Sequence, residues 1–190
     1  MKLSQPNRAG AQTRGAGARV RGFTLLELLV TIAIVAVLAT LAIPSFRSII
    51  NSNRLTAQAN ELVTSIQLAR TEAIRRNATV QICRSTDGAT CAGAVGTWDR
   101  WIVLLGNTVL RDQQLQAPVG LTASTAGLTF RADGLARNAA GALARENFVA
   151  CIETTQPTQN LRTVSVVSGS RVSTQSGDGE GACPESPTPP

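Results

Sequence analysis

The chain has 190 residues, which suits one folded domain plus a short additional segment. It contains no histidine, so the usual general base of an enzyme is missing, and no Cys-x-x-Cys pair of the kind that binds zinc. The formal net charge of +6 suggests a nucleic-acid partner, but five of the 18 basic residues lie in residues 1–22, which contain no acid. The remaining chain has 13 basic and 12 acidic residues, so its net charge is close to zero.

A basic segment precedes the longest apolar run of the chain. Residues 23–43 are apolar or uncharged except for Glu27. A helix of this length spans roughly 32 Å, enough for a bilayer core of about 30 Å. The basic segment predicts an N-terminus held in the cytoplasm and a periplasmic remainder. Two alternatives remain: a secretory signal peptide cut near Ala39, which the length of the run and Glu27 argue against, and an uncut signal anchor.

The helical pattern continues beyond the apolar run. Pro44 lacks a backbone N–H and predicts a kink or local unwinding near residues 40–43. Apolar residues then recur every three or four positions, at Leu55, Ala59, Leu62, Ile66, Ala69 and Ala73. We therefore expect one long kinked helix from Phe23 to about Asn77. Its first half, residues 23–43, would span the membrane, and its amphipathic second half, residues 44–77, would pack on a domain.

Short segments with a period of two follow the helix and predict strands. They are Thr79–Arg84, Trp98–Leu105, Thr108–Arg111, Leu121–Ser124, Leu128–Arg131, Phe148–Ile152 and Leu161–Val167. Gly106-Asn107 predicts a hairpin turn between the second and third of these. We expect an α+β fold, in which an antiparallel sheet of about seven short strands, residues 78–175, packs on the helix. Residues 176–190 predict a flexible tail tethered only by Cys183.

The four cysteines all lie beyond the apolar run, at Cys83, Cys91, Cys151 and Cys183. In the periplasm they would form disulfides, with three possible pairings. We favour Cys83–Cys91 as a local clip and Cys151–Cys183 as a staple for the tail. We expect no metal, no cofactor and no catalytic activity, since carboxylates are scattered singly and no serine lies in a Gly-x-Ser-x-Gly motif.

The start of the apolar run, Gly22-Phe23-Thr24-Leu25-Leu26-Glu27, resembles the processing site of type IV prepilins and type II secretion pseudopilins. The resemblance implies that residues 1–22 are a leader, which prepilin peptidase removes after Gly22. It also implies that the new N-terminal Phe23 is N-methylated. In this family the glutamate that corresponds to Glu27 meets the N-terminal amine of a neighbouring subunit during filament assembly. The alternative is an interfacial glutamate that reaches the lipid head groups.

Two further segments resemble the H-type minor pseudopilins and the FimT and FimU minor pilins. They are Thr97–Val103, which is similar to a Trp-rich strand, and Phe130–Ala136, which is similar to a Phe-x-x-x-Gly hairpin. The resemblance covers roughly residues 56–173 and implies two β-sheets packed against the helix. It implies a structural subunit that assembles with other pilins or pseudopilins in a type II secretion pseudopilus or a type IV pilus. Such a subunit starts in the bacterial inner membrane as a single-pass protein.

DNA binding is the alternative function. FimT-type minor pilins bind DNA through a C-terminal Gly-Arg-x-Arg element, and the matching place here is Gly169-Ser170-Arg171-Val172-Ser173. Arg171 matches one arginine of the element, whereas a serine replaces the other, which removes a phosphate contact. Arg162 is a further candidate contact, together with Arg131, Arg137 and Arg145. Because single arginines on strands usually form a solvated face, we favour the structural function over DNA binding.

Overall fold

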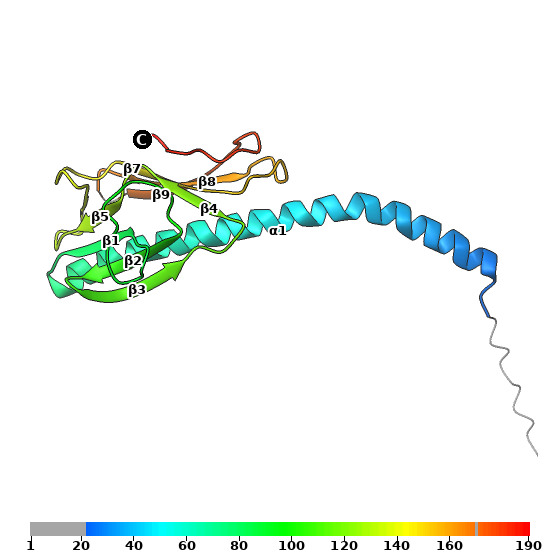
Figure 1. Cartoon of the computed structure of the whole chain (residues 1–190), viewed down its shortest axis with the longest axis horizontal. Coiled ribbons are helices and arrows are strands. Elements are labelled where there is room, and N and C mark those ends of the chain that lie inside the picture. The colour runs from blue at the N-terminus through cyan, green and yellow to red at the C-terminus, as the bar shows by residue number, and fades with distance from the viewer. Residues whose placement is uncertain (1–21, 170) are drawn as a thin grey trace, which may run out of the picture. The chain divides into compact units, whose positions relative to one another are not determined.

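The computed structural model describes residues 22–169 and 171–190, so most of the predicted leader lies outside the described residues. One long helix is followed by nine strands (Figure 1). The elements are α1 (Leu25–Arg76), β1 (Val80–Arg84), β2 (Arg100–Leu105), β3 (Thr108–Gln114), β4 (Gly120–Ala123), β5 (Gly127–Phe130), β6 (Ala136–Arg137), β7 (Glu146–Cys151), β8 (Leu161–Val167) and β9 (Arg171–Gly177). The chain divides into two units, residues 1–40 and 41–190. The predicted α+β class is confirmed.

α1 is continuous through Pro44, so the predicted local unwinding is absent, while the kink stays a prediction. A proline removes one helical hydrogen bond, and the bonds of the neighbouring turns can keep the helix intact. The C-terminal end is a Schellman motif: Asn77 has a φ of 49°, its N–H donates to Ile74 O, and the N–H of Ala78 donates to Ala73 O. This cap explains why the helix ends at Arg76, one residue before the predicted end.

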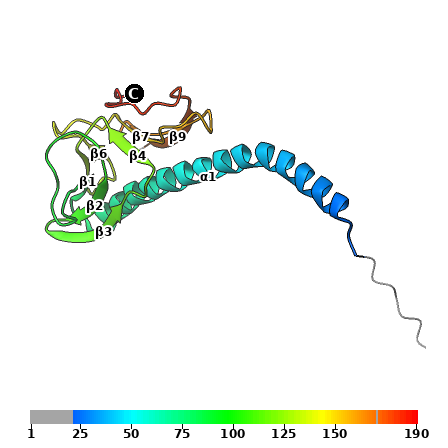
Figure 2. The same ribbon diagram turned by 45° about the vertical axis from the view of Figure 1, so that its right-hand side comes forward.

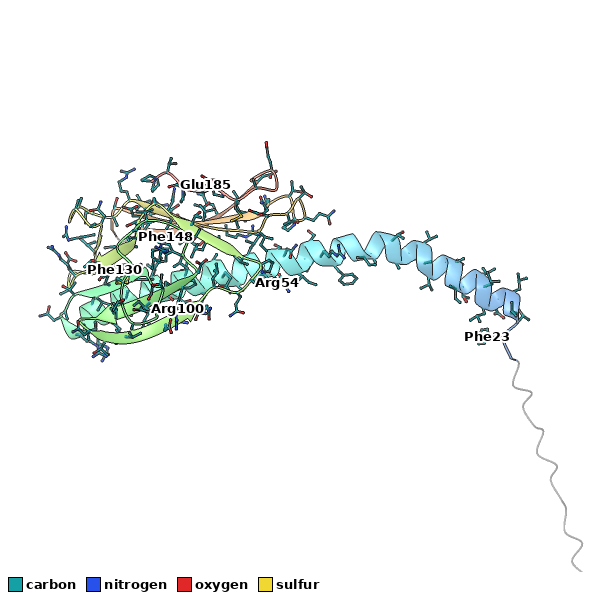
Figure 3. The ribbon with its side chains drawn as sticks, in the orientation of Figure 1. Phe23, Arg54, Arg100, Phe130, Phe148 and Glu185 are labelled. Carbon is teal, nitrogen blue, oxygen red and sulfur yellow. A yellow bond between two sulfur atoms is a disulfide. The ribbon has the colours of Figure 1, made fainter. Side chains whose placement is uncertain are left out.

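The apolar face predicted for the second half of the helix is confirmed. Leu55, Ala59, Leu62, Ile66, Ala69 and Ala73 are all at most 1% exposed. They belong to one core that also includes the inner faces of both sheets. The large aromatic side chains of this core are Trp98, Trp101, Phe130 and Phe148, of which the two phenylalanines are labelled in Figure 3. The helix therefore supplies one wall of the domain interior.

Two antiparallel sheets complete the domain (Figure 2). The first has the strand order β3-β2-β1-β5-β6, and the second has the order β4-β7-β8-β9. The predicted Gly106-Asn107 turn joins β2 to β3, with Gly106 at a φ of 57°. Two strands, β6 and β9, are additional to the seven expected ones. β6 has only two residues, and β9 is a polar edge strand without an alternating apolar pattern, so neither has a clear sequence signal.

Each tryptophan of the core donates a hydrogen bond from its indole N–H, and these bonds fix the position of the ring. Trp98 Nε1 donates to Thr125 O at 3.2 Å, and Trp101 Nε1 donates to Ser65 Oγ at 3.0 Å. The ring of Trp98 packs edge-on against Phe148, with centroids 5.1 Å apart and planes at 84°. Burying an indole therefore leaves no unsatisfied donor here, and Trp101 ties the first sheet to the helix.

The described part of the chain contains two disulfides, Cys83–Cys91 and Cys151–Cys183, which is the pairing favoured from the sequence. The tail beyond β9 is held at more points than Cys183 alone, while its flexibility stays a prediction. Side chains on the second sheet and just before β7 donate hydrogen bonds to its carbonyl groups: Thr122 to Pro184, Asn147 to Thr188 and Arg145 to Pro190. In Figures 1 and 2 this red segment lies along β7 and β9, away from the helix. The tail thus covers the outer face of that sheet.

Candidate assembly and binding surfaces

The predicted processing site lies at the start of α1. Gly22 and Phe23 precede the helix, and Phe23 is 82% exposed. Thr24 caps the helix, because its Oγ1 accepts the N–H of Glu27 at 3.2 Å and its carbonyl accepts the N–H of Leu28. Glu27 thus occupies the third helical position, where the positive end of the helix dipole stabilises its negative charge. Thr-x-x-Glu is the pattern of a capping box, a signal that the sequence analysis missed.

The first turns of α1 expose apolar side chains on all sides. Between Phe23 and Leu38 the large apolar residues are 50–82% exposed. Within the described residues, α1 is the one helix that is long and apolar enough to cross a membrane, with a mean hydropathy of 2.6 in its most apolar window. A helix that is apolar all round is stable only when an apolar medium or other helices surround it. Glu27 is the single charged residue of this segment.

Arginine–carboxylate pairs occupy the other end of α1 and the rim of the domain. Glu72 accepts hydrogen bonds from Arg75 at 2.7 Å and from Arg76 at 2.6 Å. The bond from Arg75, followed by that from Arg76, lowers the pKa of Glu72 to about 2. Further pairs join Arg100 to Asp112, Arg111 to Glu61 and Arg137 to Asp133. Five basic side chains of the domain, Arg75, Arg76, Arg100, Arg111 and Arg137, are therefore neutralised by a neighbouring acid.

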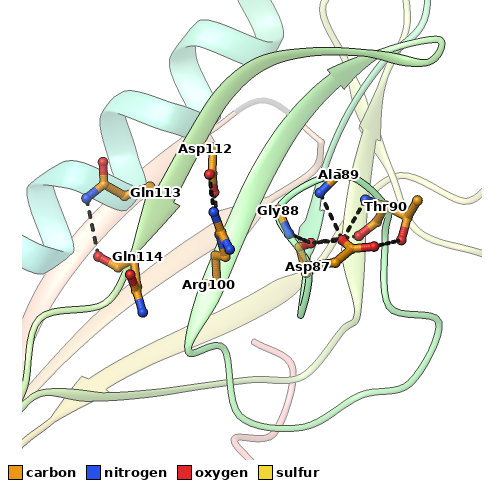
Figure 4. A network of polar contacts seen from close by, with 9 residues as sticks. Asp87, Gly88, Ala89, Thr90, Arg100, Asp112, Gln113 and Gln114 are labelled. Carbon is orange, nitrogen blue, oxygen red and sulfur yellow. Dashed lines mark hydrogen bonds and ion pairs between the residues drawn. The ribbon is translucent and has the colours of Figure 1, made fainter.

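A polar loop lies beside the first sheet, closed by the Cys83–Cys91 disulfide (Figure 4). The Asp87 carboxylate accepts hydrogen bonds from the side chain and backbone of Thr90 and from the N–H of Ala89, which hold the pKa of Asp87 well below its usual range. Gly88, at a φ of 76°, lies under the Arg100 guanidinium, where a Cβ atom would come within 2.5 Å of that group. These hydrogen bonds hold the Asp87 side chain against the backbone of its own loop.

The two arginines predicted as DNA contacts lie in different environments. Arg171 is exposed at the start of β9. Ser170, which precedes it in the predicted DNA-binding sequence, lies outside the described residues. Arg162 is only 8% exposed, and its guanidinium donates to Ser52 at 3.0 Å and to the carbonyls of Gln159 and Leu161. Arg162 therefore ties β8 to α1, which leaves little of its guanidinium exposed for a DNA phosphate. The sequence could not indicate this, because Ser52 is 110 positions away.

Two family models match the chain. The model for "Type II transport protein GspH" matches residues 58–174, which is more than half of the 190 residues. The chain belongs to the GspH family. A second model, "Prokaryotic N-terminal methylation motif", matches residues 17–43 and so includes the predicted processing site. The two matches in this GspH-family chain coincide with the two segments on which the predicted resemblance rested.

Individual relatives of this GspH-family chain are pilins and pseudopilins. Over 71 residues it is 46% identical to the pilin-like protein PilA1 of Thermus thermophilus, a match that covers 36% of this chain and 43% of PilA1. The match thus spans less than half of that relative. Among solved structures, it is similar to the type IV minor pilin FimU of Pseudomonas aeruginosa (21% identity, TM-score 0.48, 65% of this chain and 90% of FimU). It is also similar to the minor pseudopilin EpsH from the Type 2 Secretion System of Vibrio cholerae (11% identity, TM-score 0.48, 65% of this chain and 97% of EpsH).

Proposed function

We propose that the chain is a non-catalytic minor pilin or pseudopilin that is processed after Gly22 and assembled into a filament. The observation that carries this proposal is the match of both family models, one to the methylation motif and one to the following domain. The exposed apolar turns between Phe23 and Leu38 support it, since they require a bilayer before assembly and packed helices afterwards. The domain beyond them would then lie in the periplasm, where both disulfides persist.

Processing is tested by mass spectrometry of the full chain, expressed with and without a prepilin peptidase. With the peptidase, the expected product begins at N-methylated Phe23. Without it, the product retains residues 1–22. A product that keeps Met1 in both strains would reject the filament-subunit assignment, and a product that begins beyond Ala39 would identify a secretory signal peptide instead.

Glu27 is proposed to pair with the positively charged N-terminal amine of a neighbouring subunit. In an apolar layer such a pair is strong only when both charges are present. The cap at Thr24 accepts the backbone N–H of Glu27, so it does not depend on the glutamate side chain. Glu27→Gln therefore removes the charge and keeps the size of the side chain, whereas Glu27→Ala removes both.

The measured quantity is the amount of each variant in sheared filaments relative to the amount in the inner membrane. If the charge recruits subunits, both variants insert normally and are depleted from filaments. Normal incorporation of Glu27→Gln together with depletion of Glu27→Ala would show that the size of the side chain matters and its charge does not. A deletion of the whole gene distinguishes the machines, because it would impair either protein secretion or pilus formation.

DNA uptake is the weaker candidate, because Arg162 is buried and five other arginines pair with acids. It rests on the exposed Arg171. Retention of the purified chain on DNA at low salt, lost in Arg171→Ala and lost at high salt, would support it. The absence of retention at low salt would reject it.

A further inference from the structure

A cavity of about 490 Å³ opens beside β1 and β5, next to the Cys83–Cys91 disulfide. Glu146, at the start of β7, lines it and is only 7% exposed. We propose that this cavity is a socket for a basic side chain, arginine before lysine, of a neighbouring polypeptide. The proposal concerns the folded domain alone, so it does not depend on processing or on entry into a filament.

Glu146 is a buried carboxylate without a cation among the described residues. Its Oε2 accepts a hydrogen bond from Ser124 Oγ at 2.6 Å. Among the described residues it has no ion-pair partner, and its second oxygen has no hydrogen bond. Buried charges in proteins are normally paired, because an unpaired one loses its hydration without compensation. The carboxylate oxygen without a hydrogen bond is therefore available to a cation that enters the cavity.

Glu146 is also held in a fixed position. Ser124 Oγ donates to the carboxylate and at the same time accepts the N–H of Asn147 at 2.9 Å, while Ser124 N–H donates to Asn147 O at 2.9 Å. The hydroxyl lies 2.6 Å from the Glu146 carboxylate and 3.4 Å from its other acceptor, Asn147 O, so the shorter bond is the one to Glu146. A carboxylate that is positioned by its neighbours binds a cation without a large loss of side-chain freedom.

The wall of the cavity is largely neutral. Glu146 is its one charged residue within the described part of the chain, and the wall offers neutral amide and hydroxyl groups from Gln81, Thr125, Thr129 and Asn138. Small apolar residues complete it, namely Ala92, Val95, Ala126, Ala139 and Ala140. An apolar wall with few polar groups suits a side chain that has an aliphatic stem and a charged end.

The same wall argues against a divalent metal ion. Calcium is bound by six to eight oxygen atoms, several of them from carboxylates, whereas this cavity has a single carboxylate. Guanidinium is weakly hydrated and donates several hydrogen bonds in one plane, so it loses less on entry than an ammonium group or a hydrated metal ion. The class of ligand is therefore an arginine side chain, with lysine as the second choice.

The test is a titration of the full chain in neutral detergent micelles at pH 7 and low salt, followed by NMR of its backbone amides. The probes are the peptide acetyl-Gly-Arg-Gly-amide and the same peptide with neutral citrulline in place of arginine. We expect the arginine peptide to shift the amide signals of Gly93, Gly127 and Ala139 in a saturable manner. The citrulline peptide should leave them in place.

Two variants locate the site. Glu146→Gln removes the charge but keeps an oxygen for Ser124, so we expect at least a tenfold loss of affinity with no loss of thermal stability. Gly93→Leu keeps the carboxylate and narrows the cavity, since a Cβ atom at Gly93 meets no atom within 4 Å and the backbone there is not strained. It should weaken binding to a similar degree and serves alone if Glu146→Gln fails to fold. Glu185→Gln, in the exposed tail, is the matched control and should bind like the wild type.

Three results would overturn the proposal. The first is equal binding of the arginine and citrulline peptides, or no binding of either. The second is unchanged affinity in both Glu146→Gln and Gly93→Leu. The third is a calcium titration that shifts the same amides while the arginine peptide does not, which would make the cavity a metal site.

Discussion

The hydrogen bond between Trp101 and Ser65 provides a quantitative test of how the sheet is fixed to the helix. Both residues are fully buried, and Trp101 Nε1 donates to Ser65 Oγ at 3.0 Å. In Ser65→Ala the indole N–H loses its acceptor and has no access to water. The serine hydroxyl also donates to Glu61 O at 3.0 Å, a bond that lies within the helix and adds little to its stability.

The expected cost follows from two opposing effects. A buried donor without a partner costs about 1–3 kcal/mol. Alanine is a better helix former than serine, which returns about 0.5 kcal/mol. Ser65→Ala should therefore lower the free energy of unfolding by about 0.5–2.5 kcal/mol. In Trp101→Phe the donor is absent, so the further change Ser65→Ala should be neutral or slightly stabilising.

The measurement is urea unfolding of the full chain in detergent micelles, followed by far-ultraviolet circular dichroism. The four chains of the cycle are the wild type, Ser65→Ala, Trp101→Phe and the double variant, and they should give a coupling free energy of about 1–3 kcal/mol. Ser48→Ala is the matched control, because it makes the same substitution on α1 outside the core. A coupling energy near zero, or equal effects of Ser65→Ala and Ser48→Ala, would refute the argument that this bond stabilises the domain.

Other expectations concern the turns, the disulfides and acid. Gly169→Ala should lower the temperature of thermal unfolding more than Gly141→Ala. Both positions have a positive φ, but only at Gly169 would the new Cβ atom lie 2.6 Å from a backbone oxygen. Loss of the bridge to Cys183 should cost about 1 kcal/mol more than loss of the bridge to Cys91, because its sequence separation is 32 rather than 8; urea unfolding of the two serine variants compares them. Glu72 has a folded pKa of about 2 against a usual value of 4.5, so its contribution is complete above pH 4.5 and lost as the pH falls toward 2; Glu72→Gln should unfold with a weaker pH dependence in that range.

The helical half of the domain could be predicted because its signals are local. Leu55, Leu62 and Ile66 recur at the spacing of one helix face, and any helix that buries one of them buries the others. The disulfides were accessible for a related reason, since the chain has only four cysteines and one pair is close in sequence. These features can be predicted without knowing which strands pair.

Contacts between distant parts of the chain could not be predicted from the sequence. Arg162 looked like a surface cation on a strand, but its burial depends on Ser52 and on the packing of β8 against α1. The tail looked flexible because proline, glycine and serine dominate it, yet its carbonyl groups meet donors on β4 and before β7. Composition describes what a segment can do alone, whereas these segments are also held by groups that other parts of the chain supply.

Two carboxylates, Glu27 and Glu146, differ from those that pair with arginine within the domain. Asp112 and Glu72 have arginine partners within the domain, which is how an isolated fold compensates its charges. Glu27 and Glu146 have no such partner in the described part of the chain, although one lies in an apolar helix and the other is buried beside a cavity. In both places a lone charge is costly, and in both the missing cation can come only from outside the described fold. The domain core is complete without them, so we regard both carboxylates as contact points for neighbouring chains, with Glu27 acting in the membrane layer and Glu146 on the folded domain.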